Sequence, residues 1–194
     1  MSRAVAALVI AAAAMLPAEL GDEGPAEAPA AKKGCVPAAV KTEVRGVAVD
    51  ARSNSPVVVL ASTDEAEFLP IFIGPAEAAA IWRYLHHAEA PRPMTHDLLA
   101  AAIEKLGGTL RKVTVTELKK GTFYARIEIA VGEKVIEVDA RPSDAIALAL
   151  KTKTDIYVAK EVMKQAGRPN PGGKEPPGKE GPQIDLPPEA PSAI

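Results

Sequence analysis

Apolar and polar residues alternate along much of the chain with the two-residue period of a β-strand, whose neighbouring side chains point to opposite faces. Thr122–Val131 is the clearest case, because every second residue from Phe123 onward is apolar. Turn residues such as Ser53-Asn54-Ser55-Pro56 and Gly74-Pro75 separate several of these stretches. The pattern predicts seven strands, over Val44–Asp50, Val57–Ala61, Leu69–Ile73, Leu110–Leu118, Thr122–Val131, Lys134–Ala140 and Ile156–Val158.

Four other stretches have the spacing of helices. The first is Pro75–His87, and the last ends at Gly167. The stretch that begins at Thr95 and ends at Gly107-Gly108 has one apolar helical face, formed by Leu98, Leu99, Ala102, Ile103 and Leu106. The stretch from Pro142 to Leu150 is apolar nearly all round, which predicts a buried helix. This order of elements predicts a single α+β domain, a mainly antiparallel sheet with helices packed on one face.

The junction before the buried helix concentrates polar side chains at Asp139, Arg141, Ser143 and Asp144. Proline has no N–H to donate and disfavours helical geometry at the preceding residue, so Arg141-Pro142 ends the strand. Pro142 suits the first helical turn, and Ser143 and Asp144 offer oxygens to its free N–H groups. These side chains are expected on rigid elements at the edge of the core.

A second helix start has the same order of residues, in Arg92-Pro93-Met94-Thr95-His96-Asp97. Here Thr95 is expected to be the N-cap, with His96 and Asp97 in the first turn. The chain therefore has two helix starts that follow an Arg-Pro pair and carry an aspartate in their first turn.

Five blocks in order resemble the bifunctional nuclease domain family, formerly a domain-of-unknown-function family. They are Leu69-Pro70-Ile71-Phe72-Ile73-Gly74, then Glu77-Ala78, Arg92 to Leu99, Gly121-Thr122-Phe123-Tyr124-Ala125, and Asp139 to Leu150. The resemblance covers about Thr42 to Gly167 and implies an α+β fold. It also implies a nuclease that hydrolyses phosphodiester bonds of RNA and single-stranded DNA, with its site at the two Arg-Pro junctions.

The first junction has two interpretations. Arg92 and Thr95, at a helix N-terminus, could bind a substrate phosphate, with His96 and Asp97 as catalytic groups and His96 as the general acid or base. Alternatively, Asp97 only stabilises the helix dipole and His96 makes a local hydrogen bond. The spacing alone favours the structural interpretation, and the resemblance makes the two about equal.

The second junction poses the same choice. Asp139 and Asp144 could act as catalytic carboxylates or hold a divalent cation such as Mg²⁺ or Mn²⁺, with Arg141 and Ser143 on the phosphate. Glu77 is a third possible metal ligand, although a first-turn glutamate also suits a helix dipole. Arg141 could instead form an ion pair with one of the aspartates and pin the junction. No recognisable ligand spacing identifies a metal.

The charge balance gives no support for a dedicated nucleic-acid binder. Thr42–Gly167 contains 16 Lys and Arg against 17 Asp and Glu, so no basic excess would neutralise phosphates. Two other classes of function therefore stay open beside the nuclease, a non-catalytic envelope binding or scaffold domain and a phosphate- or nucleotide-binding sensor. The chain could also form a homo-oligomer.

The ends of the chain differ in composition from the domain at 42–167. Residues 1–18 have a basic start and the apolar run Ala4–Leu16, which predicts a signal peptide and export to the periplasm or medium; without it the protein would be cytoplasmic. Once it is removed, no transmembrane span is expected in the mature chain. Residues 19–41 read as an Ala/Pro/Glu-rich linker and 168–194 as a disordered Pro/Gly-rich tail.

Overall fold

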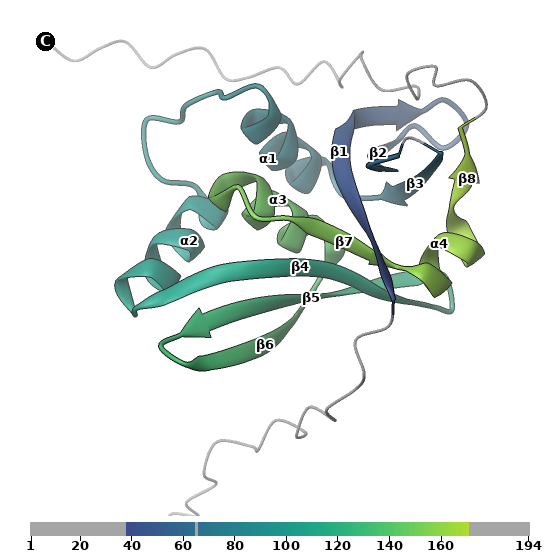
Figure 1. Cartoon of the computed structure of the whole chain (residues 1–194). Coiled ribbons are helices and arrows are strands. Elements are labelled where there is room, and N and C mark those ends of the chain that lie inside the picture. The colour runs from purple at the N-terminus through teal and green to yellow at the C-terminus, as the bar shows by residue number, and fades with distance from the viewer. Residues whose placement is uncertain (1–37, 65, 171–194) are drawn as a thin grey trace, which may run out of the picture. The chain divides into compact units, whose positions relative to one another are not determined.

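The computed structural model describes residues 38–64 and 66–170, which form one unit (Figure 1). The expected signal peptide, almost all of the linker and most of the tail lie outside these residues. The strands are β1 (Ala39–Asp50), β2 (Ser55–Ser62), β3 (Glu67–Phe72), β4 (Gly108–Lys119), β5 (Thr122–Val131), β6 (Lys134–Ala140), β7 (Ile156–Ala159) and β8 (Arg168–Pro169). The helices are α1 (Pro75–Leu85), α2 (Thr95–Lys105), α3 (Pro142–Thr152) and α4 (Lys160–Ala166).

All eight strands belong to one sheet, in the order β6-β5-β4-β7-β1-β2-β3-β8. Every neighbouring pair is antiparallel except β4 and β7, which pair in parallel through Val113 and Ile156. The α+β class and the mainly antiparallel sheet are thus confirmed. The edge strand β8, a short pairing of Arg168 with Phe68, is an addition to the seven expected strands.

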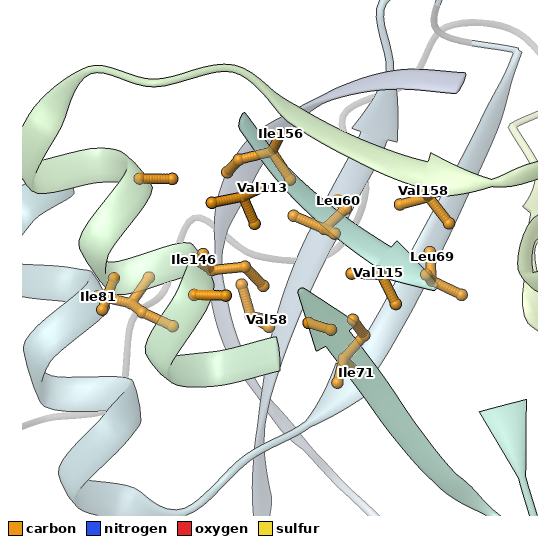
Figure 2. Close-up of a cluster of buried hydrophobic side chains, with 14 of the residues drawn as sticks. Val58, Leu60, Leu69, Ile71, Ile81, Val113, Val115, Ile146, Ile156 and Val158 are labelled. Carbon is orange, nitrogen blue, oxygen red and sulfur yellow. The ribbon is translucent and has the colours of Figure 1, made fainter. Parts of the chain in front are cut away.

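The core lies between the curved sheet and the helices (Figure 1). Figure 2 shows its centre, where valine, leucine and isoleucine side chains from β2, β3, β4 and β7 meet Ile81 of α1 and Ile146 of α3. Val162 of α4 and Ile103 of α2 also join this cluster, so all four helices pack on the same core. The expectation of helices on one face of a sheet agrees with this arrangement.

Helix α3 is the central helix. Alanine and leucine cover it nearly all round, and seven of its residues are buried (Pro142, Ser143, Ala145, Ile146, Ala147, Leu148 and Ala149). Both α1 and α2 pack against it, which places the starts of the three helices near one another. The long apolar pattern therefore correctly predicted the buried helix, and its burial positions the residues at its N-terminus.

The expected apolar face of α2 is wrong. Leu98 is 65% and Leu106 is 81% exposed, and Leu99 is also exposed. The stripe that faces the core is His96, Ala100 and Ile103, at positions i, i+4 and i+7. Of the expected face, Ile103 therefore packs on the core, and the three leucines do not.

The expected caps also need correction. The N-cap of α2 is Met94, and Thr95 is the first helical residue. The carboxylate of Asp97, at the third helical position, reaches back and accepts the N–H of the N-cap Met94 at 3.0 Å, which is the acid's half of a capping box. No side chain caps α3 either, because Asp144 binds other side chains instead of the helix N–H groups.

The described residues begin and end close to the expected domain limits. β1 begins at Ala39, which pairs with Ala159 of β7.

At one edge of the sheet, β6 is exposed along almost its whole length, including Val135, Ile136 and Val138. Between residues 38 and 170, no helix is long and apolar enough to cross a membrane.

Candidate active site

Side chains from the first turns of three helices form one hydrogen-bonded cluster. His96 of α2 lies with Nε2 3.2 Å from Oδ1 of Asp144, in the first turn of α3. Arg141, the N-cap of α3, donates to both oxygens of Asp144, from Nε at 2.6 Å and from a terminal nitrogen at 3.0 Å. The same guanidinium contacts Oε1 of Glu77, in the first turn of α1, at 2.9 Å. The two Arg-Pro junctions therefore meet, and Glu77 joins them.

Asp144 orients the imidazole of His96. With Nε2–H donated to the carboxylate, the neutral ring presents the lone pair of Nδ1, which has no hydrogen-bond partner among the described residues. Among the described residues, only Thr114 Oγ1 is a fully buried polar side-chain atom without a partner. Because Nδ1 of His96 also has no partner, it is not fully buried and keeps some contact with solvent. A base held by a carboxylate with its second nitrogen free is the arrangement of a general base.

The carboxylate of Asp144 is held in its charged form. Burial disfavours the charge, but hydrogen bonds from Arg141 and His96 outweigh burial and lower the pKa of Asp144 below its ordinary value. The same carboxylate, together with Glu77, raises the pKa of Arg141 further. The ion pair therefore keeps the Asp144 carboxylate and the Arg141 guanidinium charged at neutral pH.

Arg141 is the outward-facing member of the cluster. Its side chain is 66% exposed, whereas the side chains of Glu77 and His96 are 19% and 11% exposed. A guanidinium offers five donors in a planar fork, and the contacts to Asp144 and Glu77 hold this fork in place. Arg141 is therefore the member of the cluster that an anion from solvent can reach most easily.

Asp97 belongs to a separate network on the other side of the α2 start. Its carboxylate, 11% exposed, binds Arg83 at 2.8 Å and Lys151 at 2.9 Å. It also accepts the Tyr84 hydroxyl at 3.1 Å and the Met94 N–H. These bonds, against the opposing effect of burial, place the pKa of Asp97 well below its usual range. Burial and the bond to Asp97 raise the pKa of Tyr84 to about 12.

The remaining predicted residues stay outside both networks. Asp139 pairs in register with Arg126, whose neighbours Ala125 and Ile127 face the core. Asp139 therefore points to the opposite, outer face of the sheet, away from Asp144. Arg92 and Thr95 are exposed, and Ser143 is buried without capping α3.

Sequence reasoning missed Arg83, Tyr84 and Lys151, which surround Asp97. Arg83 and Lys151 lie in the last turns of α1 and α3, where basic residues are common. Their meeting around one aspartate depends on how the helices pack, and no local pattern in the chain signals it.

The cluster does not fit a divalent cation as it is arranged. In the described part of the chain, no group of three or more His, Cys, Asp or Glu side chains could hold a metal ion. Of the three candidate ligands, Asp139 lies on the outer sheet face, and the carboxylates of Glu77 and Asp144 both engage Arg141. A cation between them would have to displace the guanidinium.

The protein is thus an α+β domain in which a histidine and an exposed arginine share one carboxylate. The chain belongs to the bifunctional nuclease domain family, whose model matches residues 58–171, more than half of its length. An uncharacterized protein of Mycobacterium tuberculosis is 42% identical over 127 residues, which cover 66% of this chain and 76% of that protein.

Several plant relatives are named bifunctional nucleases. Bifunctional nuclease 1 of Oryza sativa subsp. indica is 29% identical over 122 residues, covering 60% of this chain and 37% of the plant protein. Bifunctional nuclease 2 of Arabidopsis thaliana is 26% identical over 110 residues, covering 55% of this chain and 33% of its own length. The match thus spans little more than a third of these plant proteins.

Proposed function

We propose that this protein hydrolyses phosphodiester bonds of RNA and single-stranded DNA at the cluster of Arg141, His96 and Asp144. One observation carries the proposal: the imidazole of His96, 3.2 Å from Asp144, shares this carboxylate with a guanidinium that is 66% exposed. Membership of the bifunctional nuclease domain family and the likeness to plant bifunctional nucleases support the choice of substrate.

Arg141 would hold the phosphate. Nη1 of Arg141, whose two N–H donors have no partner among the described residues, would contact a phosphate oxygen and stabilise the charge that gathers on it in the transition state. Glu77 and Asp144 fix the guanidinium from behind, which lowers the cost of ordering it when substrate binds.

His96 would activate water. Nδ1 takes a proton from the water whose oxygen attacks phosphorus, and the bond from phosphorus to the leaving sugar oxygen breaks, with solvent supplying the proton for that oxygen. Asp144 holds the ring in the required tautomer and stabilises the imidazolium that forms. No step requires the 2′-hydroxyl of ribose, so the same chemistry serves RNA and single-stranded DNA.

The test is cleavage of labelled single-stranded RNA and DNA by purified protein. His96→Ala and Asp144→Asn should each lower the rate roughly a hundredfold or more, as the loss of a positioned base or its carboxylate would. His86→Ala and Asp155→Asn are the matched controls, because both residues are exposed and lie outside the cluster. The controls should cleave at the wild-type rate.

Two further measurements sharpen this test. Thermal unfolding must show that the variants are folded, because the loss of a group at a helix start costs about 1 kcal/mol by itself. Assays with magnesium, manganese and a chelator test whether cleavage requires a divalent cation. We expect cleavage to persist in chelator, because the carboxylates of Glu77 and Asp144 are already paired with Arg141. Folded variants that cleave at the wild-type rate would show that His96 and Asp144 are structural, whereas wild-type protein that does not cleave would favour the non-catalytic scaffold.

We propose that the protein acts after export. The basic start and the apolar run Ala4–Leu16 motivate this location, and both lie outside the described residues. Mass spectrometry of the native protein should find the chain beginning near Ala18. Native protein that retains Ser2 in a cytosolic fraction would refute export.

A further inference from the structure

A cavity of about 690 Å³ lies where the end of α1, the start of α2 and the end of α3 meet. Asp97 lines it, whereas the neighbouring His96 takes part in the Arg141 cluster, so the α2 start separates the two sites. Ligand cavities commonly measure about 300 to 1,000 Å³, so this one is large enough for a small organic molecule.

Positive charge dominates the lining. Four cations, Arg83, Arg92, Lys151 and Lys153, face two acids, Glu89 and Asp97. The cavity therefore carries two positive charges in excess, although the chain as a whole has a net charge of −2. Such a local excess of one sign attracts an anion.

Two of these cations have no partner among the described residues. Asp97 engages Arg83 and Lys151, but no side-chain hydrogen bond or ion pair in that part of the chain involves Arg92 or Lys153. Basic residues at the ends of α1 and α3 have an ordinary explanation in the helix dipole. Arg92 does not, because it lies in the loop before α2, where Pro91 and Pro93 restrict the backbone on both sides.

Apart from Tyr84 and His87, the rest of the lining is apolar. Leu85, Ala88, Pro91, Pro93 and Leu150 contribute to the wall beside the cations. A ligand for this cavity should therefore combine an anionic group with a flat or apolar body. Inorganic phosphate would use the charges and leave the apolar wall uncovered.

We infer that this cavity binds a nucleotide unit, with its phosphate on Arg92 and Lys153 and its nucleoside on the apolar wall. The unit is either a free nucleoside monophosphate or one residue of a bound strand, and only the second source rests on the proposed nuclease function. Lys151 and Asp144 are seven residues apart on α3, which is about 10 Å along a helix, so one strand could reach both sites.

The experiment is calorimetric titration of the full chain with adenosine 5′-monophosphate, with adenosine and inorganic phosphate as separate probes. Adenosine 5′-monophosphate has no internucleotide bond, so its binding is independent of cleavage at Arg141. We expect it to bind more tightly than either probe alone. The double variant Arg92→Gln, Lys153→Gln should weaken its binding at least tenfold.

A matched double variant controls for charge and backbone. Arg111→Gln, Lys120→Gln removes the same two charges from exposed positions outside the cavity, and Lys120, like Lys153, has a positive φ (49° and 57°). We expect this variant to bind adenosine 5′-monophosphate like the wild type. Neither substitution removes a contact in the described residues, and equal melting temperatures would exclude misfolding.

Three results would overturn the inference: no binding at millimolar nucleotide, equal binding of adenosine, or equal loss in the two double variants. If binding is found, competition by a short oligonucleotide identifies the source. Displacement assigns the cavity to a strand, and its absence assigns the cavity to a free nucleotide; either supports the inference. His96→Ala should abolish cleavage without weakening this binding, which separates the two proposals.

Discussion

Asp97→Asn should destabilise the fold more than any surface charge substitution in the domain. The carboxylate is 11% exposed and faces Arg83, whose side chain is 17% exposed, and the 42%-exposed Lys151. An asparagine keeps one acceptor oxygen, but its amide nitrogen would face a cation or the Met94 N–H. The substitution therefore removes the charge while the two cations stay in place.

The magnitude follows from these contacts. Removing one partner of a buried ion pair costs about 3–5 kcal/mol, and a hydrogen bond to a charged group is worth about 1.5–3 kcal/mol. Arg83 is largely buried, but Lys151 can turn toward solvent, so the lower part of this range applies. We expect a loss of about 2–3 kcal/mol in the free energy of unfolding, from a total of about 5–15 kcal/mol for a domain of this kind.

The pH dependence gives a second, independent check. The pKa of Asp97 is lower in the folded protein than its ordinary value, so its stabilising effect is complete above about pH 4, the unfolded value. As the pH falls through the folded pKa, the carboxylate takes up a proton and the effect is lost. The stability difference between wild type and Asp97→Asn should therefore be constant from pH 7 to 5 and shrink below pH 4.

Urea denaturation followed by circular dichroism measures both quantities. Asp155→Asn is the control, because Asp155 pairs with Lys41 at 2.9 Å but is 52% exposed, and a clearly smaller loss is expected. The reasoning is refuted if Asp97→Asn is as stable as the control at pH 7, or if its deficit persists unchanged to pH 2.

Four further substitutions test other parts of the protein. Gly108→Ala should cost about 1–2 kcal/mol on denaturation, because its Cβ would lie 3.0 Å from methyl carbons of both Ile103 and Ile129. Ile146→Ala, at a fully buried position, should lower the unfolding free energy by about 2–5 kcal/mol. Leu98→Ser should change it by less than about 0.5 kcal/mol, and a larger loss would mean that the leucine face of α2 is buried. Arg141→Lys keeps the charge but loses the fork, so cleavage should fall on the order of tenfold while the melting temperature changes little.

The strands and helices could be predicted from the chain because their periods are local. Alternation along Thr122–Val131 and the long apolar run of α3 both report burial directly, and the structure bears them out. Alternation also predicts the orientation of Asp139. Because its neighbours Val138 and Ala140 are apolar, the aspartate between them must face the opposite side of the sheet. The parallel pairing of β4 with β7 could not be read in this way, because it joins residues such as Val113 and Ile156 that are distant in the chain.

The face of α2 shows where a local pattern misleads. Five apolar residues at helical spacing predict a buried face, but the helix turns His96, Ala100 and Ile103 toward α3. Two interactions from elsewhere in the chain favour this orientation, the bond from His96 to Asp144 and the ion pairs of Asp97 with Arg83 and Lys151. Polar contacts of buried side chains, which hydropathy does not register, thus outweigh the burial of three leucines.

The two Arg-Pro junctions have similar sequences but different roles in the folded protein. Asp97 and Asp144 occupy the same third helical position, as does Glu77 in α1. Asp97 meets two cations and a tyrosine in a largely buried position, which is the environment of a structural anchor. Asp144 meets an imidazole and an exposed guanidinium, which leaves a free nitrogen and a positive group open to an anion. A helix start therefore supplies only the position of the acid, and the partners that tertiary packing brings to it decide whether the acid stabilises the fold or prepares a base.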